Sequence, residues 1–127
     1  MQITKKEVYG LLWLIYSSFG KTQEEILLYI EGQVLFQTSE LIEIKLEKGV
    51  IGCYFSNGKC NKIDFLLPQW SIACALTHYF DITYRRKDKN IWICSPFPNV
   101  SYQIIYLKTK KETIGGKRIK VFMFCRI

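Results

Sequence analysis

The sequence predicts an α+β protein: an N-terminal αα-hairpin, then a mainly antiparallel sheet of about seven strands, with one helix inserted after the third strand. Three observations predict this class. Two capping-box motifs stand near the N-terminus. The hydrophobic period changes from helical to twofold after Glu40. Asn57-Gly58, a dipeptide typical of β-hairpins, joins two apolar runs. With 127 residues, the chain has the size of one domain, and we expect a single α+β domain over residues 1–127.

The first two helices are predicted by the same kind of motif. Thr4-Lys5-Lys6-Glu7 and Thr22-Gln23-Glu24-Glu25 each let a Thr hydroxyl and a Glu carboxylate accept hydrogen bonds from backbone N–H groups at a helix start. Gly20, between them, favours the left-handed conformation that ends a helix. We therefore expect helices over about residues 5–19 and 23–36, joined by a short turn. The first is apolar nearly all round, which predicts burial on several sides.

The following segment predicts three strands. Ile42, Ile44 and Leu46 alternate with charged residues, so one face of this strand is expected in the core and the other in water. Residues 50–55 and 60–66 flank Asn57-Gly58 and are expected to form a hairpin.

The rest of the chain predicts one helix and four strands. Pro68 suits the first turn of a helix, because that position needs no backbone N–H donor. A strand pair around Asp88-Lys89 and another joined through Gly115-Gly116 are expected to form two further hairpins. The expected segments are a helix over residues 69–80, strands over 82–86, 90–94, 101–108 and 117–127, and a stiff loop over 95–99.

Composition argues for a folded chain without a membrane span. The 49% hydrophobic and 15% aromatic content exclude a disordered tail. The longest apolar run, residues 8–19, is shorter than the roughly 20 residues that a membrane span requires. It follows Lys5 and Lys6 as a secretory signal would, but Glu7 interrupts it and no small-x-small cleavage site follows. We expect a cytoplasmic protein in a reducing environment, with no membrane partner.

The cysteine pattern predicts free thiols. The five cysteines are odd in number and scattered, whereas disulfide scaffolds and zinc sites favour even numbers or close pairs. The pattern therefore predicts neither a metal nor another cofactor. Cys53 and Cys60 flank the predicted hairpin turn, which leaves a disulfide between them as an open alternative. The five are Cys53, Cys60, Cys74, Cys94 and Cys125.

The net charge of +7 is unevenly distributed. Residues 1–65 carry seven Lys against eight acidic residues, whereas residues 66–127 carry eleven Lys and Arg against three acidic residues. Such asymmetry favours a polyanionic or acidic partner for the second half.

The last predicted strand indicates a surface for that partner. Its alternation assigns Ile119, Val121, Met123, Cys125 and Ile127 to one face, the expected core. The other face carries Arg118, Lys120, Phe122, Phe124 and Arg126. In sheets that bind single-stranded nucleic acid, rings stack on bases and cations neutralise phosphates. The spacing Lys120-x-Phe122-x-Phe124 resembles the basic-aromatic strand of RNA-recognition sheets, without their glycine or βαββαβ order. We take this as a shared physical device rather than as membership of that family.

Neighbouring residues extend the predicted surface. If Asp88-Lys89 is the turn, Arg85 lies opposite Trp92, and Lys108 shares a face of its strand with Tyr102 and Tyr106. The alternative is that Phe122 and Phe124 lie beneath a helix and that the terminal cations protect sheet edges from aggregation. The turns add cations able to reach a phosphate backbone: Arg86, Lys87, Lys110, Lys111 and Lys117.

Catalytic patterns are weak in this sequence. Glu43-x-Lys45 resembles the metal-binding step of restriction-type nucleases, with Glu24, Glu25 or Glu31 as upstream carboxylates, but no Pro-Asp precedes it. The one histidine, His78, is more typical of a helix C-terminal cation or a core residue than of a base.

We therefore expect a nucleic-acid-binding domain with a preference for single strands and a regulatory or accessory role, using Arg85, Arg86, Trp92, Lys108, Arg118, Lys120, Phe122, Phe124 and Arg126. The alternative is a protein-interaction or inhibitor domain of viral or mobile-element type that docks on an acidic partner. A small nuclease is the remote alternative. Exposed strand edges also allow a homodimer.

Overall fold

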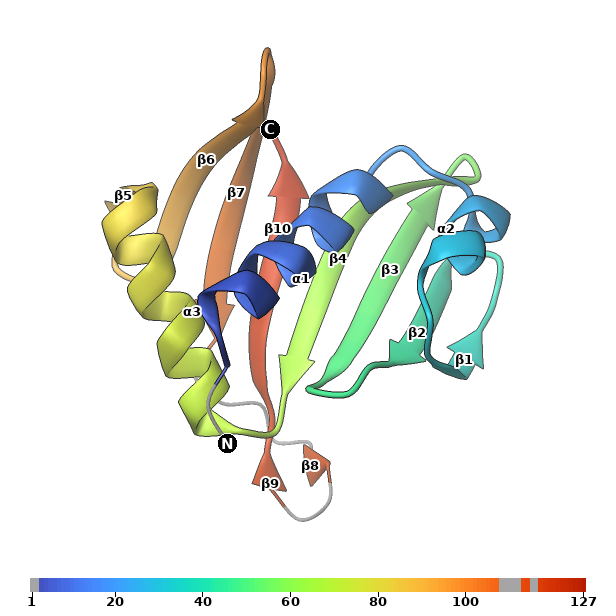
Figure 1. Cartoon of the computed structure of the whole chain (residues 1–127). Coiled ribbons are helices and arrows are strands. Elements are labelled where there is room, and N and C mark those ends of the chain that lie inside the picture. Colours follow the sequence, from blue (N-terminus) through green and yellow to red (C-terminus); the bar gives the residue numbers. More distant parts are fainter. Residues whose placement is uncertain (1–2, 108–112, 115–116) are drawn as a thin grey trace.

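The computed structural model describes residues 3–107, 113–114 and 117–127, in which three helices lie against one face of an eight-stranded antiparallel sheet (Figure 1). The predicted α+β class and antiparallel sheet are confirmed. The helices are α1 (Lys5–Ser18), α2 (Gln23–Tyr29) and α3 (Trp70–Thr83). In spatial order the strands are β1 (Gln33–Gln37), β2 (Leu41–Lys45), β3 (Val50–Ser56), β4 (Lys59–Leu67), β10 (Lys120–Arg126), β7 (Val100–Leu107), β6 (Ile91–Phe97) and β5 (Arg85–Asp88). A separate pair is formed by β8 (Thr113–Ile114) and β9 (Lys117–Arg118).

Both predicted helix starts are confirmed. The Glu7 backbone N–H donates to Thr4 Oγ1 at 3.1 Å, and the Thr4 N–H donates to Glu7 Oε1 at 3.1 Å. Thr22 and Glu25 repeat this arrangement at the start of α2. Each such cap contributes about 1 kcal/mol. The expected burial of α1 on several sides is wrong, because one stripe of the helix faces the sheet while Trp13 is 63% exposed.

The second helix is shorter than the sequence predicts. Its last residue is Tyr29, and the chain then forms β1, so the predicted helix over residues 23–36 is wrong from residue 30 onward. Gly32 lets the chain pass close to β2, because a Cβ there would lie 2.5 Å from the Lys45 carbonyl oxygen. The extra strand means that α3 follows the fourth strand rather than the third.

The predicted hairpin between β3 and β4 is confirmed. Asn57 has φ 54° and Gly58 has φ 77°, and two successive positive φ angles match the right-handed twist of the flanking strands. In β2, Ile42 and Ile44 are completely buried, as their alternation predicts.

In the second half of the chain, from residue 66 onward, the structure differs from the prediction mainly in where the helix and the strands begin and end. Helix α3 continues to Thr83, so the strand expected from residue 82 begins only at Arg85. Strand β6 extends through Phe97, where a loop over residues 95–99 is predicted, and the turn to β7 lies at Pro98 and Asn99. The expected pairing of the strands before and after Gly115-Gly116 is confirmed, since β7 and β10 are antiparallel neighbours.

The core lies between the sheet and the helices, and Phe80 of α3 is near its aromatic centre. Its ring centroid is 5.4 Å from that of Trp92, 5.5 Å from that of Phe122 and 6.3 Å from that of Phe124. Burying a large apolar side chain stabilises a fold by roughly 1.5–3 kcal/mol. Strand β10 pairs with both β4 and β7, so the last strand of the chain joins the two halves of the sheet.

The five cysteines are free thiols, with Cys53 and Cys60 both buried on the core side of the β3–β4 hairpin. The alternative of a disulfide between these two is therefore not what the structure contains. A hydrogen bond with Cys60, together with burial, raises the pKa of the Cys53 thiol. Within the described residues, no helix has the length and apolar character needed to cross a bilayer.

Candidate functional site

The predicted nucleic-acid surface has its three rings in the core. Trp92, Phe122 and Phe124 are completely buried, so their faces are inaccessible to a base. In antiparallel pairing, partners point to the same side of a sheet, and Phe122 pairs with both Phe65 and Tyr106 on the side covered by the helices. The interpretation of these rings as an exposed stacking platform is wrong. Whether the chain binds nucleic acid stays a prediction.

The opposite face of β10 shows why alternation alone misleads here. Met123 and Cys125, predicted as core, are only half-buried, and their neighbours Asp64 and Gln103 are polar. Val121 is nevertheless completely buried. Both faces of β10 therefore carry large side chains, and the sequence pattern is compatible with burial of either one.

The side chains of Trp92 and Arg86 contact each other beside the end of α3. Arg86, rather than the predicted Arg85, pairs with Trp92 across β5 and β6. The Trp92 indole N–H donates to Asp81 Oδ1 at 2.9 Å, and Arg86 forms an ion pair with the same oxygen. The Arg86 guanidinium also lies 5.6 Å from the Trp92 ring centroid. The indole hydrogen bond and the guanidinium hold the pKa of Asp81 below its usual range. These groups anchor β5 to α3.

The remaining predicted cations are scattered. Arg85 and Arg126 are exposed, and Lys120 is half-buried where it pairs with Leu67. Lys108 lies outside the described residues, as does the side chain of Arg118. The predicted turn cations Lys110 and Lys111, and the side chain of Lys117, fall outside them too. The structure thus brings together Arg86 and Trp92 of the predicted set, and gives them a structural role.

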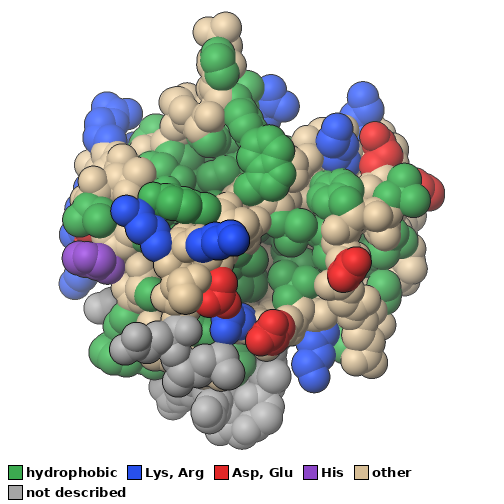
Figure 2. Space-filling model, in the orientation of Figure 1, with side chains coloured by type: hydrophobic (Ala, Val, Ile, Leu, Met, Phe, Trp, Pro, Cys, Tyr) green, Lys and Arg blue, Asp and Glu red, His purple; other side chains and the backbone are tan. Residues whose placement is uncertain are grey.

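The sheet edge formed by β1 has an unusual composition. All five residues of β1 are exposed, and three consecutive apolar side chains are nearly half exposed: Val34 at 41%, Leu35 at 48% and Phe36 at 48%. Within the described ranges β1 pairs only with β2. Leu28 of the adjacent α2 is 86% exposed. Figure 2 shows hydrophobic side chains at the surface over α2 and β1, at the right of the view.

The other edge of the same sheet is composed differently. Strand β5 has the sequence Arg85-Arg86-Lys87-Asp88, and all four residues are exposed. An edge strand presents unpaired backbone groups, and charged side chains on it prevent pairing with another chain. Both edge strands contain a bulge, so the difference between them lies in their side chains. Strand β5 is protected in this way, whereas β1 has no charged residue and no proline.

The sequence pattern does not predict the β1 edge, because the helix expected over residues 23–36 includes most of this strand. Glu31-Gly32 was the available signal, since a glycine after a polar residue is typical of a helix end. The two exposed glutamines that bracket Val34, Leu35 and Phe36 are also compatible with a short strand.

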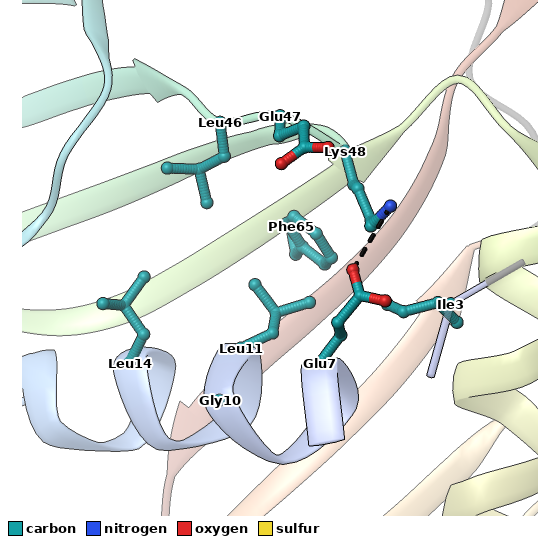
Figure 3. A pocket seen from close by; sticks show the side chains of 9 residues that line it. All are labelled: Ile3, Glu7, Gly10, Leu11, Leu14, Leu46, Glu47, Lys48 and Phe65. Atoms are coloured by element: carbon teal, nitrogen blue, oxygen red, sulfur yellow. Dashed lines mark ion pairs between the residues drawn. The ribbon is translucent and has the colours of Figure 1, made fainter. Parts of the chain in front are cut away.

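A shallow groove lies between α1 and the β2–β3 turn (Figure 3). Its floor is apolar, and an ion pair lies at its mouth, with Lys48 Nζ 3.3 Å from Glu7 Oε2. The backbone N–H of Thr4 holds the pKa of Glu7 below its usual value, so this carboxylate serves the helix cap as well. The groove thus consists of an apolar surface with one ion pair at its mouth. Its lining consists of Ile3, Glu7, Gly10, Leu11, Leu14, Leu46, Glu47, Lys48 and Phe65.

The described part of the chain contains no cluster of side chains suited to hold a metal ion. No group of three His, Cys, Asp or Glu side chains converges there, so Glu43 and the upstream glutamates do not form the cation site of the nuclease hypothesis. His78 is exposed on α3. Comparison with protein-family models, with curated proteins and with solved structures finds no match.

Proposed function

We propose that this chain is a protein-binding domain that takes up an extended segment of its partner along β1. The observation that carries the proposal is the contrast between the two sheet edges: β5 is charged, whereas β1 exposes Val34, Leu35 and Phe36 without a charged neighbour in the strand. Strand addition to an exposed edge is a common mode of peptide recognition, in which main-chain hydrogen bonds give affinity and side chains give specificity.

The expected affinity is modest. Full burial of a Val, Leu or Phe side chain is worth roughly 1.5–3 kcal/mol. Because the three side chains on β1 are already about half buried, each has about 1 kcal/mol left to contribute. Association costs several kcal/mol in lost motion. A complex that uses this edge alone is therefore expected to be transient, and Leu28 of α2 offers further apolar contact at its side.

Site-specific photocrosslinking in the native cells tests this proposal. A benzoylphenylalanine in place of Leu35 should give one prominent protein adduct, and the same replacement at Ile82, an exposed apolar position on α3, should not. Adding Val34→Lys should abolish the adduct, because a lysine on an edge strand opposes pairing. Circular dichroism should confirm that the variants are folded. Identical adducts from both positions, or an adduct that survives Val34→Lys, would contradict the proposal.

Nucleic-acid binding is the second candidate function, favoured by the exposed cations Arg85, Lys87 and Lys89 near the β5–β6 turn. Phosphate contacts make affinity fall steeply with salt. With Trp92, Phe122 and Phe124 buried, the single-strand preference has lost its structural basis. Anisotropy titrations of labelled single- and double-stranded DNA and RNA should then give weak, salt-sensitive binding without preference among them. Tight binding of single strands alone would favour this candidate over the first.

A further inference from the structure

We infer that a pocket beside α3 binds a small, uncharged, planar heteroaromatic compound. The pocket has a volume of about 390 Å³, within the range of about 300–1,000 Å³ that is typical of small-molecule sites. It is formed by α3, by the residue that precedes β6 and by the end of β7. The site does not include β1, so the inference is independent of the proposed function. The described lining consists of Trp70, Cys74, Thr77, Asn90 and Tyr106.

A row of aligned aromatic rings crosses the helix-covered side of the sheet and ends at this pocket. Phe122 pairs with Phe65 of β4 and with Tyr106 of β7, and partners in antiparallel strands point to the same side. The Tyr106 ring stacks on the Phe122 ring, with centroids 4.6 Å apart and planes at 21°. The next position in the row is Asn90, whose carbonyl oxygen accepts a hydrogen bond from the Tyr106 N–H at 2.9 Å. Because asparagine has no ring, a planar ligand at this position would continue the stack.

Helix α3 contributes a second aromatic ring to the pocket. Trp70, Cys74 and Thr77 follow the spacing i, i+4 and i+7, so they lie along one side of the helix. The Trp70 side chain is 66% exposed. Trp13 and Trp92 each pack against a phenylalanine ring, whereas the Trp70 ring has no aromatic partner among the described residues. Its indole is therefore available to stack on a planar ligand.

The polar groups of the pocket favour an uncharged ring with an amide-like edge. The Asn90 side chain carries a donor and an acceptor side by side. The Thr77 hydroxyl already donates to the Ala73 carbonyl oxygen at 2.9 Å, so its oxygen is left as an acceptor. Lys89, which precedes Asn90, is exposed and is not part of the described lining, which contains no charged side chain. A phosphate or carboxylate would lose water there without gaining a counterion.

Carbostyril is a suitable probe for this chemistry, because it is a flat, uncharged bicyclic lactam with adjacent N–H and C=O groups. We expect it to bind with a dissociation constant on the order of 0.1–1 mM, as is usual for about 11 non-hydrogen atoms. N-methylcarbostyril lacks the N–H donor and should bind about fivefold more weakly. The saturated octahydro derivative keeps the lactam without the flat ring and should bind at least about tenfold more weakly. Protein-observed NMR titrations measure all three.

The two partly buried thiols locate the bound probe in the unmodified protein. Cys74 lines the pocket, whereas Cys125 lies on β10 and is the matched control. At a carbostyril concentration about ten times the dissociation constant, alkylation of Cys74 by iodoacetamide should slow about tenfold. Alkylation of Cys125, followed in the same sample by mass spectrometry, should be unchanged.

Two variants test the assigned contacts. Trp70→Ala should weaken binding about tenfold through lost stacking. Trp13→Ala is its control, because Trp13 is 63% exposed and lies outside the pocket, and it should leave binding unchanged. Asn90→Gly keeps a residue that accepts the φ of 62° at this position but removes the amide. It should abolish the preference for carbostyril over its N-methyl derivative.

Several results would overturn the inference. Equally tight binding of the octahydro derivative would show filling of an apolar space without recognition of a ring. Equal slowing at Cys74 and Cys125, or at neither, would place the probe outside the pocket, and this measurement needs no variant to fold. Binding that survives Trp70→Ala, or no detectable binding up to the solubility limit of carbostyril, would overturn it as well. Circular dichroism should confirm that each variant is folded.

Discussion

Replacement of Phe124 by alanine tests whether this residue belongs to the core or to a binding surface. The ring is completely buried and packs edge-on against Tyr16 and Phe80, with centroid distances of 6.0 and 6.3 Å. Removing a buried Phe side chain costs about 3–5 kcal/mol in lost burial and residual cavity. Domains of this kind are stable by about 5–15 kcal/mol, so Phe124→Ala is expected to remove at least about a fifth of the stability.

Urea unfolding followed by far-ultraviolet circular dichroism measures this loss. With a urea dependence of about 2 kcal/mol per molar, a loss of about 4 kcal/mol lowers the unfolding midpoint by about 2 M and leaves the slope unchanged. Arg126→Ala is the matched control, because Arg126 lies in the same strand but is exposed. Its effect is expected to stay within about 0.5 kcal/mol.

Unfolding of Phe124→Ala at nearly the same urea concentration as the parent chain would contradict the burial of this ring. Such a result would mean that the Phe124 ring contributes little to the core and is open to solvent. The basic-aromatic face of β10 would then be available to stack on bases, and the nucleic-acid hypothesis would regain its main support.

Three further predictions concern other parts of the molecule. Gly10→Ala in the middle of α1 should raise stability by about 0.5–1 kcal/mol, because glycine weakens a helix and the added Cβ would meet no atom within 4 Å beyond its chain neighbours and the helix's own backbone. A lower melting temperature would contradict this prediction. Asp81→Asn keeps an oxygen for the Trp92 indole but removes the charge. Because folding lowers the pKa of Asp81, its charge stabilises the fold above the ordinary carboxyl pKa, and this contribution is lost as the pH falls through the folded pKa. The variant should therefore lose less stability between about pH 4 and pH 2 than the parent, and equal losses in urea titrations would contradict the assignment. A thiol reagent should react first with the partly buried Cys74 and Cys125 and should reach all five thiols only when the protein unfolds. Rapid reaction of all five thiols in the native protein would contradict the burial of the other three cysteines.

The features that depend on neighbouring residues could be predicted from the amino-acid sequence. Thr4 and Thr22 begin helices because their side chains satisfy N–H groups three residues away. Asn57-Gly58 forms the predicted hairpin because both residues accept positive φ angles. The uneven charge of the two halves is likewise a property of the chain alone. None of these features depends on a partner that is distant in the sequence.

Tertiary packing determines which surfaces are buried and which remain open. Alternation in β10 defines two faces, but the packing of α1 and α3 selects the one with Phe122 and Phe124 for the core. Residues 30–36 have a helical pattern in isolation, yet residues 33–37 form β1, because Gly32 permits close approach to β2 and strand pairing satisfies the backbone there. The open β1 edge has the same explanation. Burial and strand pairing depend on residues far apart in the chain, whereas a local sequence pattern shows only which structures a segment is able to form.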